Sequence, residues 1–419
     1  MSFARYPEYK DSGVEWLGEV PVHWDVCALK RLLEIQNGSD HKHIEQTEGY
    51  PVIGSGGQFA YASDYLYDGE SVLLGRKGTI DKPLYVTGKF WTVDTMYWSK
   101  IASDACGRYT YYTALTIPFS YYSTNTALPS MTQSTLSAHT VARPPLEEQT
   151  AIATFLDHET AKIDALVVEQ QKLIALLQEK RQAVISHAVT KGLNPNAPMK
   201  DSGVEWLGEV PEHWEVLPLK RVSPQQTVGI VVNPSEYVTD EGLPFIYGGD
   251  ISEGRIDYAS SRQISLENSG RNSKTQLRAG DLLTVRVGAP GITAVVPPEC
   301  EGGNCASVML VRRGEFNSDW LCYTMNSRVV RYQVEIVQYG AAQEQFNINH
   351  AVQFLIPHPP RTEQDALASF LNLETSRLAN LEDQARTAIT LLQERRSALI
   401  SAAVTGQIDV RNWSVSESA

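Results

Sequence analysis

The residue patterns of the common catalytic sites are missing from this sequence. Its one Gly-Lys dipeptide, Gly88-Lys89, is followed by Phe90, so the chain carries no GxxxxGK[ST] phosphate loop. It has no GxGxxG turn between a strand and a helix, and no Asn/Asp-Pro-Pro-aromatic tetrapeptide of the kind that holds an extruded base. No HExxH pair occurs among the nine histidines. We predict no catalytic residue and no metal site on this chain.

Polar side chains on glycine-rich turns are the remaining candidates for chemistry. Arg and Lys reach guanine, Asn and Gln bridge adenine, and Ser and Thr contact either a base or a phosphate. Any one of these residues is more simply explained as a solvated loop residue, but their clustering favours binding of base edges. The candidates are Ser55, Gln58, Arg76, Lys77, Thr79, Lys82, Asn125 and Gln133, followed by Arg255, Arg271, Lys274, Arg286, Gln343, Gln345, Asn347 and Asn349.

The charge of the chain has the wrong sign for bulk attraction to nucleic acid. The net charge is −13 and the pI is near 5.2. Residues 22–142 alone carry 9 Lys and Arg against 11 Asp and Glu. A local patch must therefore make any DNA contact, and a partner must supply further phosphate contacts.

The sequence contains two internal repeats. Residues 10–21 read KDSGVEWLGEVP, and residues 200–211 repeat them letter for letter. A second repeat pairs residues 144–190 with 359–405, identical at 23 of 47 positions. The two regions between these repeats, about 22–143 and 212–358, share little beyond glycine-rich turns. A common frame with two different inserts suggests two readers on one scaffold.

Each copy of the second repeat predicts a long helix that begins after a Pro-Pro pair and runs about 40 residues, roughly 60 Å. Apolar residues recur at alternating spacings of three and four, which is a heptad pattern and requires a partner helix. We expect each helix to pair with the other copy, although each stripe could instead pack on its own variable region. The residues expected to pair are Ile163, Leu166, Leu173, Leu177, Val184, Leu378, Leu381, Leu392 and Leu399.

Composition fits a folded chain of two or three domains. Its 419 residues are 42% hydrophobic and 20% charged, and no stretch approaches 18 apolar residues. The five cysteines form no CxxC pair, which fits a reducing compartment. Short apolar runs bounded by turns predict strands in both variable regions. We expect a cytoplasmic protein without a membrane segment.

Several segments of the sequence resemble those of a known protein family. The doubled cap KDSGVEWLGEVPxHW, the segments at 144–164 and 391–410, and VLLGRKGT at 72–79 are similar to the specificity subunits of type I restriction-modification systems. Residues 279–290, 301–307 and 339–349 are similar to stretches common in their target recognition domains. The resemblance covers essentially the whole chain.

This resemblance implies an α+β fold with a pseudo-twofold internal repeat. Two globular target recognition domains, each a mixed β-sheet or partial barrel with helices, would be separated by two long helices paired as an antiparallel coiled coil. The expected parts are a first cap and recognition domain (1–143), a long helix (144–192), a linker with the second cap and recognition domain (193–358), a second long helix (359–405) and a tail (406–419).

The resemblance also implies the function. Each recognition domain would read one half of a bipartite, asymmetric site in double-stranded DNA, and the helices would set the spacer. The subunit would dock two modification (methyltransferase) subunits and restriction (endonuclease and translocase) subunits. S-adenosylmethionine, ATP and Mg²⁺ are expected on those partners and no cofactor on this chain.

Three alternatives stay open at this stage. The chain could be a nuclease or methyltransferase with degenerate motifs, which an activity assay without partners would reveal. It could be a structural coiled-coil protein whose variable regions bind other proteins, and it would then leave no footprint on DNA. It could also be a specificity subunit that works with fused or solitary modification partners.

Overall fold

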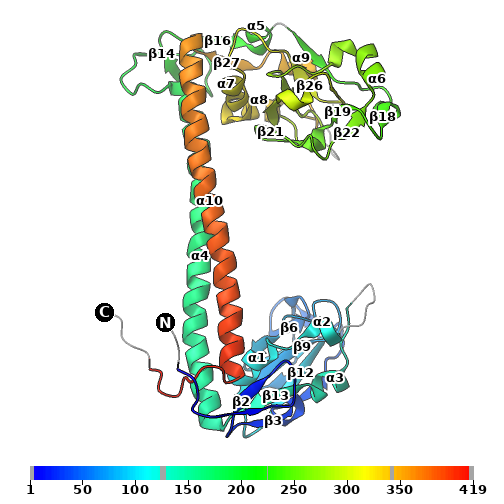
Figure 1. The fold of residues 1–419 in the computed structure, drawn as a ribbon, viewed down its shortest axis with the longest axis vertical. Helices are drawn as coiled ribbons and strands as arrows, with labels where there is room; N and C mark the ends of the chain where they lie inside the picture. The colour runs from blue at the N-terminus through cyan, green and yellow to red at the C-terminus, as the bar shows by residue number, and fades with distance from the viewer. Residues whose placement is uncertain (1–3, 123–128, 224, 340–343, 415–419) are drawn as a thin grey trace. The chain divides into compact units, whose positions relative to one another are not determined.

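The computed structural model describes residues 4–122, 129–223, 225–339 and 344–414. They form two compact units. Unit 1 comprises Met1–Gln171 with Arg386–Ala419, and unit 2 comprises the continuous stretch Lys172–Ala385. Both units contain a cap hairpin, a β-rich lobe and parts of two long helices (Figure 1).

Unit 1 begins with a two-stranded cap and continues into lobe 1. The cap consists of β1 (Tyr9–Asp11) and β2 (Glu19–Pro21), and β3 (Asp25–Ala28) pairs with β13 (Thr140–Arg143) at the base of the lobe. Between them lie β4 (Leu33–Asn37), β5 (Glu45–Gln46), β6 (Tyr50–Gly54), β7 (Gly57–Ala62), β8 (Tyr67–Asp68), β9 (Ser71–Gly75), β10 (Leu84–Val86), β11 (Lys89–Thr92), β12 (Met96–Ile101), α1 (Gly107–Ala114), α2 (Phe119–Tyr122) and α3 (Gln133–Ala138).

Unit 2 repeats this order. Its cap is β14 (Met199–Asp201) with β15 (Glu209–Pro211), and β16 (Glu215–Pro218) pairs with β27 (Leu355–His358). Lobe 2 contains α5 (Leu219–Val222), β17 (Gln226–Val228), β18 (Val238–Thr239), β19 (Leu243–Ile246), β20 (Ile251–Ser252), β21 (Arg255–Ile256), β22 (Arg262–Ile264), α6 (Leu266–Arg271), β23 (Leu282–Thr284), β24 (Thr293–Val295), β25 (Asn304–Cys305), β26 (Met309–Val311), α7 (Ser318–Asn326), α8 (Arg328–Val337) and α9 (Ile348–Ala351).

The two lobes share one sheet topology although their sequences have diverged. The order β10-β9-β12-β4 in lobe 1 corresponds to β24-β23-β26-β17 in lobe 2, antiparallel throughout. In the other sheet β11 runs parallel to β6, and β25 likewise runs parallel to β19. The parallel register joins Val52 to Trp91 in lobe 1 and Phe245 to Asn304 in lobe 2. The lobes therefore keep the strand pairing while the residues that fill it change.

The long helices are α4 (Leu146–Lys191) and α10 (Arg361–Val404). In each unit a segment of α4 lies antiparallel to a segment of α10 (Figure 1). Arg396 Nε donates to Asp164 Oδ1 at 2.9 Å in unit 1, and Gln178 Nε2 donates to Glu382 Oε1 at 3.0 Å in unit 2. In an antiparallel pair, residue numbers rise along one helix as they fall along the other, so contacting residues have a constant sum. Both pairs add up to 560 and therefore fit one antiparallel register. The predicted antiparallel pairing of the two copies is confirmed.

The predicted pairing residues are only partly correct. Ile163, Leu177 and Leu378 are buried, and Val184, Leu392 and Leu399 are half-buried. Leu166, Leu173 and Leu381, in contrast, are 51%, 41% and 40% exposed.

The covered positions next to these three leucines are Val167, Ile174 and Glu382. We call the line of covered residues along which α4 and α10 meet the seam. At every second predicted position the seam residue is the one that follows the predicted residue in the sequence. Leu166-Val167 and Leu173-Ile174 are both apolar pairs, so hydrophobicity could not choose between their members. In the second copy the seam position is the polar Glu382 rather than the apolar Leu381.

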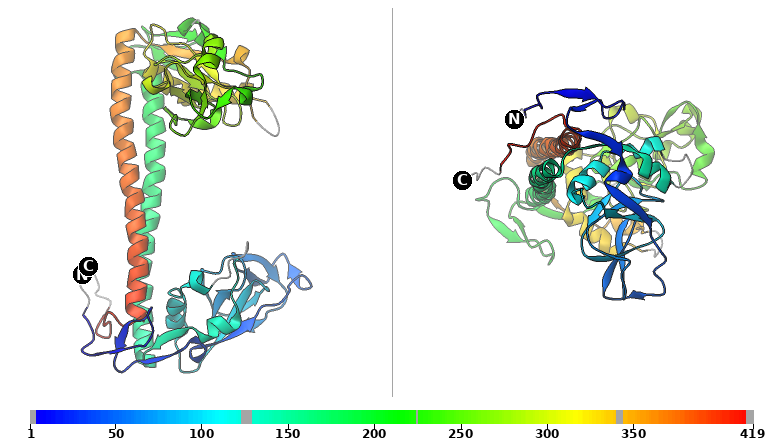
Figure 2. Two further views of the ribbon diagram at one scale, coloured as in Figure 1. Left: turned by 45° about the vertical axis from the view of Figure 1, so that its right-hand side comes forward. Right: turned by 90° about the horizontal axis from the view of Figure 1, so that it is seen from below.

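Each cap closes the core of its unit. In unit 1 the fully buried Trp24 joins the first turns of α4 and the last turns of α10 in one core with Phe155, Ile400 and Val404. In unit 2 Trp214 joins a core with Ile185 and Val189 of α4 and Leu367 of α10. Both views in Figure 2 show the first cap, in dark blue, beside the helix ends of its own unit.

Candidate functional site

Four loops of lobe 1 meet where strands β6, β9 and β11 end. We call residues 54–57, 75–79, 93–95 and 129–131 the strand-end loops of lobe 1. The backbone N–H groups of Arg76 and Lys77 donate to Thr95 O at 2.9 and 3.2 Å. Gly78 N donates to Pro129 O at 3.0 Å, and Met131 N donates to Arg76 O at 2.9 Å. Backbone bonds thus hold Arg76 and Lys77 beside segment 129–131.

Lobe 2 builds the same arrangement. Its strand-end loops are residues 247–249, 285–288, 306–307 and 344–346. Gly288 N donates to Glu344 O at 3.0 Å, and Phe346 N donates to Arg286 O at 3.2 Å. These bonds place Arg286 where Arg76 lies in lobe 1, and Gly288 where Gly78 lies. Both glycines have positive φ, +84° and +89°, a conformation that favours glycine.

The side chains of Arg76 and Arg286 are half-buried and anchored by backbone carbonyls. Arg76 Nη1 donates to Asp94 O at 3.3 Å, and Arg286 Nε donates to Phe346 O at 3.4 Å. Arg312 differs, because its Nη1 donates to the buried Asp281 Oδ2 at 2.6 Å. Among the described residues, these bonds occupy one N–H donor of each loop arginine and leave the other donors available for a ligand.

The other predicted residues of lobe 1 divide between the loops and structural roles. Ser55 lies in the loops, and its Oγ would be 3.2 Å from a Cβ placed on Gly78. Gln58, Lys77 and Lys82 are exposed, and Thr79 is half-buried. Gln133 Nε2 donates to Ile35 O at 2.7 Å, so this side chain ties α3 to β4. Asn125 lies outside the described residues.

In lobe 2, Gln345 and the two asparagines lie at the strand-end loops or directly after them. Gln345 forms an isolated bridge with Val287. Asn347 caps α9, because its Oδ1 accepts from Asn349 N at 2.9 Å. Gln343 lies outside the described residues.

Three predicted residues of lobe 2 are placed on other elements. Arg271 pairs with Glu267 on α6, its Nη2 lying 2.5 Å from Oε1. Arg271 and Lys274 line a surface groove of about 440 Å³ with residues 227–232. Arg255 lies on β21, in the β20–β21 hairpin.

Metal binding finds no support in the part of the chain that the structure describes. In that part no three His, Cys, Asp or Glu side chains gather in a way that could hold a metal ion. Cys300 and Cys305 are buried free thiols, and burial raises the pKa of Cys300 to about 11 and that of Cys305 to about 12. Both free thiols are therefore protonated at neutral pH.

The sequence did not reveal how each lobe is attached to its helix. In unit 1 the Tyr112 hydroxyl donates to Asp157 Oδ1 at 2.7 Å and lies 3.1 Å from Thr160 Oγ1. We call Arg108, Tyr112, Asp157 and Thr160 the first lobe–helix contact. Arg108 on α1 completes it by an ion pair with Asp157.

Unit 2 has the equivalent contact between α7 and α10. Tyr323 OH donates to Asn372 Oδ1 at 2.8 Å and lies 2.9 Å from Thr375 Oγ1. Asn372 and Thr375 follow Asp157 and Thr160 by 215 residues, the spacing of the helix repeat. Asp319 takes the place of Arg108, and we call Asp319, Tyr323, Asn372 and Thr375 the second lobe–helix contact. The repeated Thr160 and Thr375 could have signalled these contacts in the sequence.

Comparison with known proteins agrees with this architecture. Residues 21–175 match the sequence model of the type I restriction modification DNA specificity domain. The EcoBI specificity subunit of a type I restriction enzyme, from Escherichia coli, is 23% identical over 97% of this chain and 91% of its own length. Over nearly its whole length this chain is therefore similar to a specificity subunit of a type I restriction enzyme. Specificity subunits are non-catalytic and recognise DNA.

Solved structures of specificity subunits share the fold. A chain from a structure of a type I restriction-modification system has a TM-score of 0.65 at 17% identity, over 92% of this chain and 98% of that one. The HsdS subunit from Thermoanaerobacter tengcongensis has a TM-score of 0.52 at 16% identity, over 93% and 98%. The α+β fold class predicted from the sequence is therefore confirmed. No helix in the described residues is long and apolar enough to cross a membrane.

Proposed function

We propose that each lobe of this specificity subunit reads one half of a bipartite, asymmetric DNA site through its strand-end loops. The supporting observation is that one loop arrangement, held by the same backbone bonds, occurs twice on lobes whose sequences differ. Two readers with one architecture and different side chains suit two different half-sites. The candidate residues in and beside the loops supply donors and acceptors for the major groove.

Lobe exchange tests this division of labour. Replacing the first variable region, residues 25–143, with that of another specificity subunit should change the methylated sequence of one half-site only. The assay is a map of methylated adenines on DNA treated with the assembled complex. A change in both half-sites, or in neither, would show that the lobes do not read separately.

We propose that α4 and α10 set the spacer between the half-sites. A heptad inserted into both helices keeps the seam in phase and adds roughly 10 Å, about three base pairs of duplex. The insertion points are Leu173 on α4 and the opposing turn of α10 near Ala385. The spacer should lengthen while both half-sites stay the same; an unchanged spacer would reject this role.

We propose that exposed leucines repeated on both helices help to dock two modification subunits. Leu166 and Leu381 occupy the same repeat position and are 51% and 40% exposed. Leu176 and Leu391 are likewise equivalent, at 53% and 59% exposed. Large apolar side chains kept at exposed positions are typical of interaction surfaces. Restriction subunits would then join this assembly.

Native mass spectrometry of the assembled complex tests this docking. Replacing Leu166 and Leu391 of unit 1 with Gln should release one modification subunit, and the matched change of Leu176 and Leu381 in unit 2 should release the other. Retention of both subunits in both variants would exclude the leucines. S-adenosylmethionine, ATP and Mg²⁺ would act on the partner subunits, in the cytoplasm.

A further inference from the structure

We infer that Arg76 and Arg286 are equivalent phosphate anchors, and that base choice in each lobe lies with the neighbouring residues that differ. This inference rests on the proposed reading of DNA by the strand-end loops. It assigns different tasks to residues that the sequence alone could only place in one group of candidates.

The first argument is the identity of these two arginines in lobes that otherwise differ. Aligning β9 with β23 by strand pairing matches residues 71–78 with 281–288, and three of the eight positions are identical. Leu73 and Leu283 are identical and fully buried, so packing explains them. Gly78 and Gly288 are identical because both adopt positive φ. The third identity is Arg76 and Arg286. Each side chain bonds to one backbone carbonyl of a neighbouring loop, and a shared ligand would give a further reason for the identity.

The second argument is electrostatic. Arg76 and Arg286 are half-buried residues, although the Arg76 Nη1 bond lies at the exposed surface, and among the described residues no carboxylate lies within ion-pair distance of either. A partly desolvated charge without a counter-ion is unfavourable until an anion arrives. This cost is unusual in a chain of net charge −13, where acidic partners are plentiful. A DNA phosphate would supply the missing charge.

The third argument concerns what a shared residue can do. Phosphate contacts fix the register of a protein on the duplex and carry no sequence information, whereas base contacts specify sequence. Two lobes that read different half-sites can share the first kind of contact and must differ in the second. Around the arginines the equivalent residues do differ: Ser55 and Gly248, Lys77 and Val287, Asp94 and Ser307.

The backbone carbonyls also prepare the arginines for this role. Asp94 O and Phe346 O each hold one N–H of the guanidinium group. This restriction lowers the entropy lost when the remaining N–H groups bind a phosphate. A phosphate needs only a correctly placed charge with two donors, which a tethered guanidinium offers.

Binding of the assembled complex to the duplex that the wild-type complex methylates tests the assignment. Arg76→Ala and Arg286→Ala should each weaken binding about ten-fold. Each should also make the slope of log K against log salt shallower by about 0.9, and the double variant by about twice that amount. The methylated sequence should stay unchanged in all three variants. Arg76→Lys keeps the charge and should restore the salt slope.

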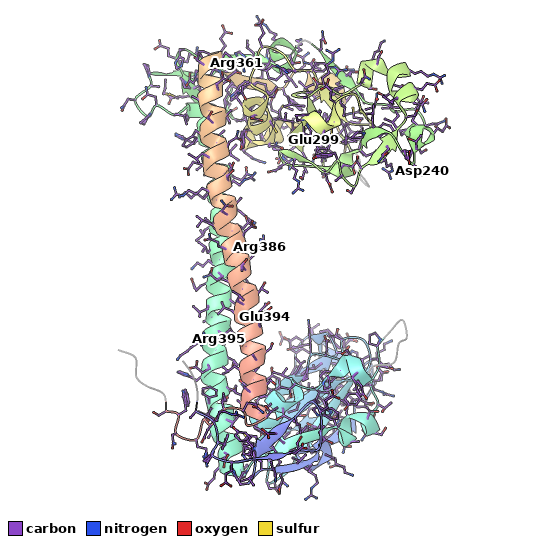
Figure 3. All side chains as sticks on the ribbon, in the orientation of Figure 1. Asp240, Glu299, Arg361, Arg386, Glu394 and Arg395 are labelled. Atoms are coloured by element: carbon purple, nitrogen blue, oxygen red, sulfur yellow. The ribbon has the colours of Figure 1, made fainter. Side chains whose placement is uncertain are left out.

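Two matched controls make the outcome decisive. Lys77→Ala should alter the methylated bases of the first half-site, and Arg395→Ala, on an exposed face of α10 outside both lobes (Figure 3), should change neither slope nor sequence. Relaxed base preference in Arg76→Ala, or an unchanged slope, would overturn the phosphate assignment. A wild-type complex that methylates no bipartite site would instead refute the proposed function itself.

Discussion

The two lobe–helix contacts share their hydroxyl groups, but the charged residue on the lobe side is basic in unit 1 and acidic in unit 2. Tyr112 and Tyr323 bond to equivalent positions of α4 and α10, whereas Arg108 faces Asp157 in unit 1 and Asp319 faces Asn372 in unit 2. The lobe cores differ in the same way. Ser71 and Ser99 share hydrogen bonds at the start of β9, where lobe 2 has the buried pair Asp281 and Arg312 at the start of β23.

This comparison shows which features the duplicated architecture requires. The tyrosine contacts, the cap tryptophans and the strand order are kept, so they define the scaffold. The charges around them are free to change as long as each lobe changes together with its own helix. A lobe is therefore matched to its helix, and the following variants test that matching.

The largest effect is expected where the two units are alike. Trp24 and Trp214 are fully buried, and each donates its indole N–H to a glutamate, Glu148 or Glu363, at 3.0 Å. Trp24→Ala and Trp214→Ala should each destabilise their own unit by about 3–5 kcal/mol. Hydrogen exchange should show lost protection in the mutated unit. Equal loss in both units would mean that they do not fold separately.

The ion pair of Asp281 and Arg312 in lobe 2 should contribute more to the free energy of unfolding than the hydrogen bond of Ser71 in lobe 1. Asp281→Ala leaves Arg312 without its carboxylate and should destabilise unit 2 by about 3–5 kcal/mol. Ser71→Ala, which removes one hydrogen bond, should cost unit 1 about 1 kcal/mol. Hydrogen exchange of β23 and β9 measures the two. An Asp281→Leu, Arg312→Met double variant should recover only part of the loss, because Asp281 also accepts from Arg278 N and Arg313 N. No recovery at all would show that these backbone bonds, not the ion pair, carry the stability.

Acid sensitivity should distinguish the units at one position. Burial between the Trp16 ring and the Tyr122 hydroxyl lowers the pKa of His139 from 6.5 to about 4, whereas unit 2 has Phe354 at this place. The unfolded chain takes up a proton that folded His139 refuses, so unit 1 loses stability as pH falls from 6.5 to 4 and is unaffected above that range.

At pH 5.5 this loss should be about 1 kcal/mol. Exchange of unit 1 amides at pH 7.0 and 5.5 measures it, and His139→Phe should abolish the difference. The same pH dependence in the His139→Phe protein would assign the acid sensitivity to other groups.

The smallest effect concerns the charges of the lobe–helix contacts. Asn372→Asp places a carboxylate beside Asp319, whose Oδ2 lies 3.4 Å from Asn372 Nδ2, and should destabilise unit 2 by about 0.5 kcal/mol because both groups are solvated. Adding Asp319→Arg to this variant recreates the ion pair of unit 1, and the stability of unit 2 should then rise instead of fall. A double-mutant cycle measures the coupling, and zero coupling would argue against matched lobes and helices.

The caps and long helices were predictable because their sequences are repeated within the chain. The caps, both long helices and their pairing followed from repeats and heptads, and the antiparallel direction was what the family resemblance implied. The seam was misplaced at Leu166, Leu173 and Leu381, since adjacent apolar residues leave the phase ambiguous and a seam position can be polar. Local hydrophobicity cannot show which of two neighbours a partner helix covers.

The lobes were harder to predict. Their shared topology depends on strand pairing between distant segments, and paired positions such as Val52 and Phe245 have no identity to align. Arg76, Lys77 and Arg286 were identified as candidates, and the structure places them at equivalent loops. Arg271 and Lys274 were equally good candidates by residue type, but only long-range folding decides which loops come together.

The closure of unit 1 has a consequence for biosynthesis. Tyr9 OH donates to Gly406 O at 2.9 Å and Asp409 N donates to Ala4 O at 2.8 Å, so residues near both ends of the sequence complete one core. Unit 2 is continuous and can fold while the ribosome is still translating. In unit 1, in contrast, the core around Trp24 stays incomplete until residues 386–414 emerge. A premature stop in α10 would therefore leave the earliest-made part of the protein unfinished.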